Sequence, residues 1–284
     1  MAPETQHPQL PLPDYFSKFA AMYARGTGHA TLNILGDVIT GDIQTSDSPI
    51  GPESVVHDTA SGPGIGAAAL VAHLPKDKLP KEVLVSDNVP PMVEAARNSL
   101  VASPLPSVKC QVLDSQDLSS IPDGYFTHSI NNFSIFTFTR PVEAVRETYR
   151  TLRPGGLAVI TCWRRFAPMF IVHAAQKMIR PDLPLTPTPS PQFFEDGVLQ
   201  KVVEEAGFPS AGIAVTTKEL VIVDEDNKAG LSAFMSGPLM QAARQGYTEE
   251  EKGRWSEAIS HAVKSEVEQF GGIRFEAYVL LATK

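Results

Sequence analysis

The sequence predicts an α/β fold, because strand-like and helix-like segments alternate from residue 54 onward. The strand-like runs leave room for one helix between most neighbours, and a glycine-rich turn follows the first of them. The strand-like runs are 54–57, 82–86, 108–113, 125–130 and 157–163, and the helix-like runs are 64–74, 90–101 and 141–152. Such βαβ units predict a parallel sheet with helices on both faces.

The segments that flank this alternating core predict additional helices within a single domain. The "LRPGG" segment at 152–156 predicts a helix end and a tight turn before the last core strand, and 211–223 and 273–284 predict further strands. The expected parts of the domain 1–284 are a flexible tail (1–13), two N-terminal cap helices (14–41), a cofactor-binding core (54–163) and two helical insertions over the substrate (164–192 and 228–270).

Composition and charge argue against several functional classes. The 284 residues are 43% hydrophobic and carry a formal net charge of −8, without a dense cluster of lysines and arginines. This acidic balance disfavours binding to nucleic-acid phosphates. Two isolated cysteines indicate a reducing compartment, and neither a secretory signal nor a membrane-length apolar run stands out. We therefore expect a cytoplasmic protein, monomeric or homodimeric, that binds neither nucleic acids nor membranes.

The segment "HDTASGPGIG" fits two cofactor motifs. Counted from Gly62 it matches the G-x-G-x-x-G/A pattern of dinucleotide sites. Counted from Asp58 it matches the D-x-G-x-G-x-G pattern of S-adenosylmethionine sites, with Ala60 in the first glycine position. Glycines here let a ligand approach the backbone closely. The Asp58 carboxylate would repel a pyrophosphate anion but attract a cationic amino group or hydroxyl groups.

Acidic or amide side chains also stand at the ends of the next strands, at Asp87, Asp114 and Asn131. An acidic residue about 20 residues beyond the turn suits ribose hydroxyls in both cofactor classes, so Asp87 does not separate them. An acceptor at Asp114 suits an adenine amino group. The whole series favours S-adenosylmethionine, and an NAD-type oxidoreductase remains the alternative.

Four motifs within 54–163 resemble those of the class I S-adenosylmethionine-dependent methyltransferases. They are "VVHDTASGPGIG", "VSDNVPPMVEAAR", "VLDSQDLSSIPDGYFTHSI" and "TLRPGGLAVITCW". With "YFTHSINNFSIFTF" and the terminal "FEAYVLLATK", they are similar to fungal small-molecule methyltransferases of secondary metabolism, of the gliotoxin bis-thiomethyltransferase type. The resemblance implies a Rossmann-like, seven-stranded, mostly parallel sheet whose antiparallel last strand lies between strands five and six.

The resemblance also implies which residues surround the cofactor. Asp87 would bind the ribose hydroxyls, Asp114 and Ser115 the adenine edge, and Asn131 and Asn132 the methionine end. Together with Asp58, the expected cofactor-binding residues are Tyr23, Thr31, Ala60, Gly62, Gly64, Asp87, Asn88, Met92, Asp114, Ser115, Asn131 and Asn132.

Methyl transfer from a sulfonium depends chiefly on alignment, so a general base is optional. The best candidate base is His173, on the helix expected after strand five. No Cys/His cluster has metal-binding spacing, so we expect no metal. Apolar side chains expected near the pocket indicate a small, largely apolar substrate, although core packing is the alternative role for each. These candidate substrate residues are Tyr15, Phe133, Trp163, Phe170, Phe234 and Met235.

The sequence therefore predicts an enzyme that methylates an oxygen or sulfur atom of a small metabolite. A methyltransferase fold that binds the same cofactor but catalyses a rearrangement without methylation is the main alternative.

Overall fold

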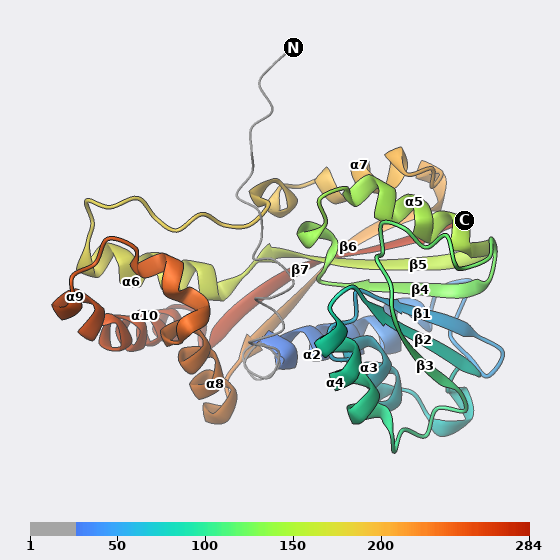
Figure 1. Cartoon of the computed structure of the whole chain (residues 1–284), viewed down its shortest axis with the longest axis horizontal. Coiled ribbons are helices and arrows are strands. Elements are labelled where there is room, and N and C mark those ends of the chain that lie inside the picture. Colours follow the sequence, from blue (N-terminus) through green and yellow to red (C-terminus); the bar gives the residue numbers. More distant parts are fainter. Residues whose placement is uncertain (1–26) are drawn as a thin grey trace, which may run out of the picture.

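The computed structural model describes residues 27–284, apart from the side chain of Leu239. The expected tail, the first cap helix, Tyr15 and Tyr23 lie outside the described residues. A seven-stranded sheet forms the centre, with the strand order β3-β2-β1-β4-β5-β7-β6 (Figure 1). The strands are β1 (Val55–Thr59), β2 (Glu82–Asp87), β3 (Val108–Val112), β4 (Phe126–Asn132), β5 (Leu152–Arg165), β6 (Ile213–Ile222) and β7 (Ile273–Thr283).

The sheet has the predicted topology. β1 pairs in parallel with both β2 and β4, and β4 pairs in parallel with β5. β7 is antiparallel to both of its neighbours, β5 and β6, so the antiparallel last strand lies between strands five and six as expected. The strand order reverses beside β1, and ligands of open α/β sheets bind at the carboxyl ends of the strands at such a switch point.

Helices cover both faces of the sheet (Figure 1). α2 (His29–Asp37), α3 (Ile65–His73) and α4 (Pro90–Leu100) lie on one face, and α5 (Pro141–Thr151) and α7 (Val198–Glu205) lie on the other. Each face has its own buried apolar cluster, which contains Val56 and Leu70 on the first and Phe126 and Val203 on the second. Burial of these clusters is the main force that holds the layers together.

A helical lobe extends beyond the carboxyl end of β5 (Figure 1). It contains α6 (Ala167–Ile179), α8 (Glu225–Ser236), α9 (Glu249–Gly253) and α10 (Trp255–Phe270). Local sequence sets two of its helix starts, because Asp224 caps α8 and Thr248 forms a capping box with Glu251 at α9. None of the helices in the described part of the chain combines the length and apolar character needed to cross a bilayer.

Shorter helical segments link these elements. They are a π-helical turn, η2 (Val38–Ile43), and the 3-10 segments η3 (Lys76–Lys78), η4 (Ile135–Thr137), η5 (Pro191–Phe194), η6 (Ser210–Gly212) and η7 (Pro238–Arg244).

The "LRPGG" prediction was wrong in one respect, because β5 begins at Leu152 rather than after the turn. Leu152 pairs with Phe126, and the register shifts before His128 pairs with Leu157. Gly155, at φ +76°, supplies the bend inside the strand, and the backbone of Lys284 bonds to Gly155 and Gly156. A long-range pairing therefore converts the expected loop into the start of a strand.

Candidate cofactor site

The turn after β1 has a repeated left-handed backbone. Ala60, Gly62 and Gly64 have φ values of 48°, 56° and 89°, so every second residue requires a conformation that favours glycine. This explains the spacing of the motif, with Ala60 as its strained member. A Cβ atom on Gly62 would meet nothing within 4 Å, so the backbone is open to a ligand there. A Cβ atom on Gly64 would lie 3.2 Å from the Cβ of Ala96 in α4.

Asp58 is buried beneath the start of α3. Its Oδ2 atom accepts a hydrogen bond of 2.9 Å from the Ala67 N–H, and a Cβ atom on Gly66 would lie 2.3 Å from Oδ1. Burial raises the pKa of Asp58 to about 7; the Ala67 N–H opposes this shift and the Asp87 carboxylate adds to it. The structure thus gives Asp58 a role in holding α3 against the turn, and its contact with a cofactor stays a prediction.

Asp87 ends β2 and is fastened to the turn. Its Oδ2 atom accepts a hydrogen bond of 2.8 Å from the Gly62 N–H, and Oδ1 accepts one of 2.9 Å from the Val89 N–H. Burial raises the pKa of Asp87, and these two N–H groups oppose the rise. Nearby, Asn88 is exposed and Met92 is buried in α4. The structure therefore brings Asp87 to the open position of the turn, as the sequence motif requires.

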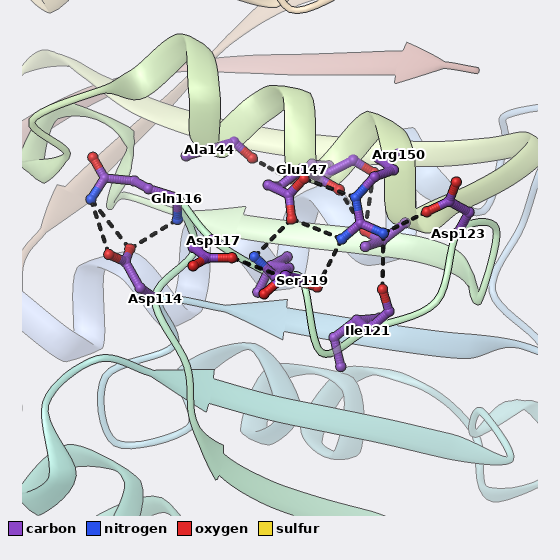
Figure 2. A network of polar contacts seen from close by, with 12 residues as sticks. Asp114, Gln116, Asp117, Ser119, Ile121, Asp123, Ala144, Glu147 and Arg150 are labelled. Carbon is purple, nitrogen blue, oxygen red and sulfur yellow. Dashed lines mark hydrogen bonds and ion pairs between the residues drawn. The ribbon is translucent and has the colours of Figure 1, made fainter.

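The loop after β3 brings Asp114 and Ser115 to the edge of the sheet where the carboxyl ends of the parallel strands meet, called the carboxyl edge below. Ser115 Oγ lies 2.8 Å from Thr59 Oγ1, which ties this loop to the end of β1. Asp114 Oδ1 accepts a hydrogen bond of 2.9 Å from the Gln116 N–H, as Figure 2 shows. Asp114 and Ser115 therefore stand at the carboxyl edge, and their contact with adenine stays a prediction.

An ion-pair network that sequence reasoning missed holds this loop against α5 (Figure 2). Arg150 donates to Glu147, to Asp123 and to the carbonyl oxygens of Leu118 and Ile121, while Glu147 accepts from the Leu118 N–H at 2.7 Å. The hydrogen bond from Arg150 lowers the pKa of Glu147, which keeps the pair charged. The i,i+3 spacing of Glu147 and Arg150 on a helix was the available signal for the pair, but not for its loop partners.

Asn131 and Asn132 end β4 and have different surroundings. Asn132 Oδ1 accepts a hydrogen bond of 2.8 Å from Thr161 Oγ1, and its Nδ2 donates to the Thr31 carbonyl at 3.4 Å. Asn132 thereby joins α2 to the carboxyl edge and brings Thr31 close to it. The Oδ1 atom of Asn131 is buried and has no hydrogen-bond partner among the described residues. A buried acceptor of this kind is typical of a site that a ligand completes.

These residues fit S-adenosylmethionine better than a dinucleotide. The open backbone at Gly62 adjoins Asp87, and the buried Asn131 Oδ1 atom lacks a partner among residues 27–284. Carboxylate and amide oxygens attract the positive charge and hydroxyl donors of S-adenosylmethionine, whereas they repel a pyrophosphate. Among the described interactions, no lysine or arginine side chain bonds to residues 58–64.

The structure gathers most of the predicted substrate residues in the core of the helical lobe. The Phe133 and Trp163 rings stack with centroids 3.8 Å apart, and Phe234 and Met235 are buried in the same cluster. Phe170 is 52% exposed, with the Arg165 guanidinium over its ring. These positions favour the packing role for the four buried residues, and substrate contact stays a prediction.

His173 also has a structural partner. Its Nε2 atom lies 2.8 Å from the Thr186 carbonyl oxygen, which anchors the proline-rich segment after α6. A role as a general base therefore stays a prediction. Within residues 27–284, no three His, Cys, Asp or Glu side chains are grouped so that they could hold a metal ion.

Comparison with known proteins identifies the fold. Residues 58–160 match the family model described as a methyltransferase domain. The methyltransferase ucsB of an Acremonium species is 31% identical over 134 residues, which are 44% of this chain and 46% of that protein. The match thus spans less than half the length of this curated relative.

Solved structures match over much more of the chain. The [4+2]-cyclase SpnF has a TM-score of 0.59 at 15% identity, over 98% of each chain. Phosphoethanolamine N-methyltransferase 2 of Haemonchus contortus, solved with S-adenosylhomocysteine, has a TM-score of 0.53 at 15% identity, over 98% of this chain and 61% of that one. YcgJ of Bacillus subtilis has a TM-score of 0.52 at 17% identity, over 90% and 98%. The chain therefore has the fold of the class I S-adenosylmethionine-dependent methyltransferases, with a methyltransferase domain at its centre.

Proposed function

We propose that this protein transfers a methyl group from S-adenosylmethionine to an oxygen or sulfur atom of a small, largely apolar metabolite in secondary metabolism. The observation that carries the proposal is the open backbone at Gly62, next to Asp87, together with the buried Asn131 Oδ1 atom that has no partner among the described residues. The partial match to the methyltransferase ucsB of an Acremonium species supports methyl transfer. We propose that it acts in the cytoplasm as a monomer or homodimer.

In this proposal, each part of the edge holds one part of the cofactor. Asp87 accepts hydrogen bonds from the ribose hydroxyls, Asp114 and Ser115 face the adenine, and Asn131 faces the methionine amino group. When bound, S-adenosylmethionine would supply a methyl group activated by its sulfonium charge, and the sulfur would keep the electron pair of the C–S bond when the acceptor takes that methyl group and gives up its proton. The protein contributes alignment and exclusion of water.

A substitution at Asp87 tests the cofactor site. We expect Asp87→Ala to weaken binding of S-adenosylhomocysteine by about 1–3 kcal/mol, because charge-assisted hydrogen bonds to the ribose are lost. Isothermal titration calorimetry measures the effect, and Asp77→Ala on the exposed η3 is the matched control. A folded Asp87→Ala protein with unchanged affinity would contradict the assigned role of Asp87.

A second candidate function is a rearrangement that uses the bound cofactor without consuming it. The observation in its favour is the structural similarity to the [4+2]-cyclase SpnF over 98% of both chains. Mass spectrometry with methyl-labelled S-adenosylmethionine and metabolite mixtures separates the two functions. Label in a product together with new S-adenosylhomocysteine supports methyl transfer, whereas an unlabelled isomer of a substrate supports rearrangement.

A further inference from the structure

Besides Asp58 and Asn131, four buried side-chain oxygens make no hydrogen bond among residues 27–284, at Asp42, Ser129, Ser134 and Gln192. Asp42 is paired with Lys218 at 2.7 Å and Ser129 lies inside β4, whereas the remaining two lie outside the strands of the sheet. They are Ser134 Oγ and Gln192 Oε1. Ser134 stands at the start of η4, where a serine hydroxyl ordinarily caps the helix, yet it makes no such bond. Its backbone carbonyl accepts from Thr137 instead. Buried oxygens destabilise a fold unless a partner satisfies them, so both positions indicate a ligand.

The backbone brings Ser134 and Gln192 near the carboxyl ends of β4 and β5. Phe133, at φ +54°, turns the chain out of β4, so Ser134 stands just past the end of that strand. η5 packs against β5 and carries Gln192. Ser190 Oγ donates a hydrogen bond of 2.7 Å to the Phe136 carbonyl, which joins the segment before η5 to η4. Ser134 and Gln192 are therefore each two positions along the chain from one end of the Ser190–Phe136 hydrogen bond.

The surroundings of this pair are apolar. Ile135 and Phe193 are buried in the cluster on the α5 face of the sheet, and Phe136 packs against it. A mostly apolar ligand with one polar group would fit these surroundings. Its polar group can bond to the two oxygens while its apolar part is buried away from water.

The charges nearby indicate whether the polar group of the ligand is neutral or anionic. The two arginines at the end of β5 are both engaged, because Arg165 holds Glu266 with bonds of 2.7 and 3.0 Å and Arg164 holds Glu276 at 2.6 Å. A carboxylate would need a free cation. A neutral hydroxyl or thiol needs only the hydroxyl of Ser134 and the amide oxygen of Gln192.

We infer that Ser134 and Gln192 contact the methyl acceptor and select one that presents a neutral hydroxyl or thiol rather than a carboxylate. This inference rests on the proposed methyl transfer and adds its substrate class. Ser134 and Gln192 would hold the reacting oxygen or sulfur through hydrogen bonds, and the apolar body of the acceptor would lie against Phe136.

Three probes with one apolar frame test the selection: 2-naphthol, 2-naphthalenethiol and 2-naphthoic acid. Each is incubated with the full chain and methyl-labelled S-adenosylmethionine. We expect the naphthol or the thiol to take up label at least about tenfold faster than the acid. Ser134→Ala and Gln192→Met should each raise the KM for that acceptor about tenfold, which corresponds to one buried hydrogen bond. The matched controls are Ser260→Ala on α10 and Gln200→Met on α7.

The affinity for S-adenosylhomocysteine and the Tm of each variant separate a loss of acceptor contact from a loss of cofactor binding or of stability. Both variants should bind S-adenosylhomocysteine within twofold of the parent, and neither should lower the Tm, because neither oxygen has a hydrogen-bond partner among the described residues. Preference for the acid, unchanged KM values, or a Tm lowered by more than about 2 °C relative to the controls would overturn the inference. If the parent binds S-adenosylhomocysteine but labels none of the three probes, the inference is also overturned. If the parent does not bind S-adenosylhomocysteine, the proposed function fails instead.

Discussion

The carboxyl edge of β1–β4 and the helical lobe differ in whether their buried polar groups have hydrogen-bond partners. At the edge, Asn131 buries an oxygen without a partner among the described residues, and the turn holds Ala60 at positive φ. In the lobe, Arg165 is paired with Glu266, and Trp255 Nε1 donates to the Met235 carbonyl. The edge thus contains an unsatisfied oxygen and a strained backbone, whose unfavourable free energy a ligand can offset, whereas the lobe is packed as a hydrophobic core.

The largest expected effect concerns the lobe. Trp163 is 3% exposed and packs against Phe133, Phe166 and Phe275. We expect Trp163→Ala to lower the free energy of unfolding by about 3–5 kcal/mol, because a cavity replaces a stacked ring. Chemical denaturation measures the loss, and Phe170→Ala, at an exposed ring, should cost less than about 1 kcal/mol. Equal stability of the Trp163→Ala protein and the parent would contradict a packing role for Trp163.

The next effect concerns the edge and depends on pH. Because the pKa of Asp58 rises from 3.8 to about 7 on folding, its stabilising contribution is complete below pH 3.8 and is lost as pH rises through about 7. Asp58→Asn keeps an acceptor for the Ala67 N–H but removes this titration. The variant should therefore gain about 2–4 kcal/mol over the parent between pH 5 and pH 8, measured by urea unfolding. Parallel pH profiles of the two proteins would refute the raised pKa.

His57 titrates with the opposite sign and serves as an internal reference. Burial lowers its pKa from 6.5 to about 3, so its contribution is present above pH 6.5 and is lost as pH falls. The contributions of Asp58 and His57 therefore oppose each other below pH 6.5. Because both proteins contain His57, its contribution cancels when Asp58→Asn is compared with the parent between pH 5 and pH 8.

A smaller effect follows from the close contact between Gly66 and Asp58. The added methyl group of Gly66→Ala would lie 2.3 Å from Asp58 Oδ1, so α3 must shift. We expect a loss of about 1–3 kcal/mol in the free energy of unfolding, as is typical of overpacking. Ala68→Gly, two residues further along the same helix, measures the effect of a glycine–alanine exchange without the contact. A Gly66→Ala protein as stable as the parent would place Asp58 elsewhere.

The smallest expected effect is at Ala60. Its φ of 48° favours glycine, so Ala60→Gly relieves strain in the turn, although glycine also gains freedom in the unfolded chain. The net change in the free energy of unfolding should be stabilising by up to about 1 kcal/mol. Thermal unfolding can measure it, with Ala242→Gly in η7 as the control, and a destabilised Ala60→Gly protein would argue against the left-handed conformation.

The sequence predicted the regions that depend on local interactions, and it did not predict those that depend on contacts between residues far apart in the chain. The turn could be predicted because the left-handed positions at 60, 62 and 64 constrain residue type directly. The placement of Asp87 follows from the strand-end rule for parallel sheets. In contrast, Phe133 stacks on Trp163 from 30 residues away and Glu266 pairs with Arg165 from 101 residues away, and no local pattern indicates either contact.

The same limit applies to Asp58 and His173. Their residue types suited a ligand or a base, but their partners are the Ala67 N–H and the Thr186 carbonyl oxygen. Backbone groups of this kind leave no signature in the sequence, because every residue other than proline has both. Ser134 and Gln192 were missed for a related reason, since the absence of a partner is visible only once the chain is folded.

Calorimetric titration of the full chain with S-adenosylhomocysteine, and separately with NADH, tests the cofactor assignment most directly. We predict saturable one-to-one binding of S-adenosylhomocysteine, weakened in Asp87→Ala, and no binding of NADH. Binding of NADH without binding of S-adenosylhomocysteine would contradict the account.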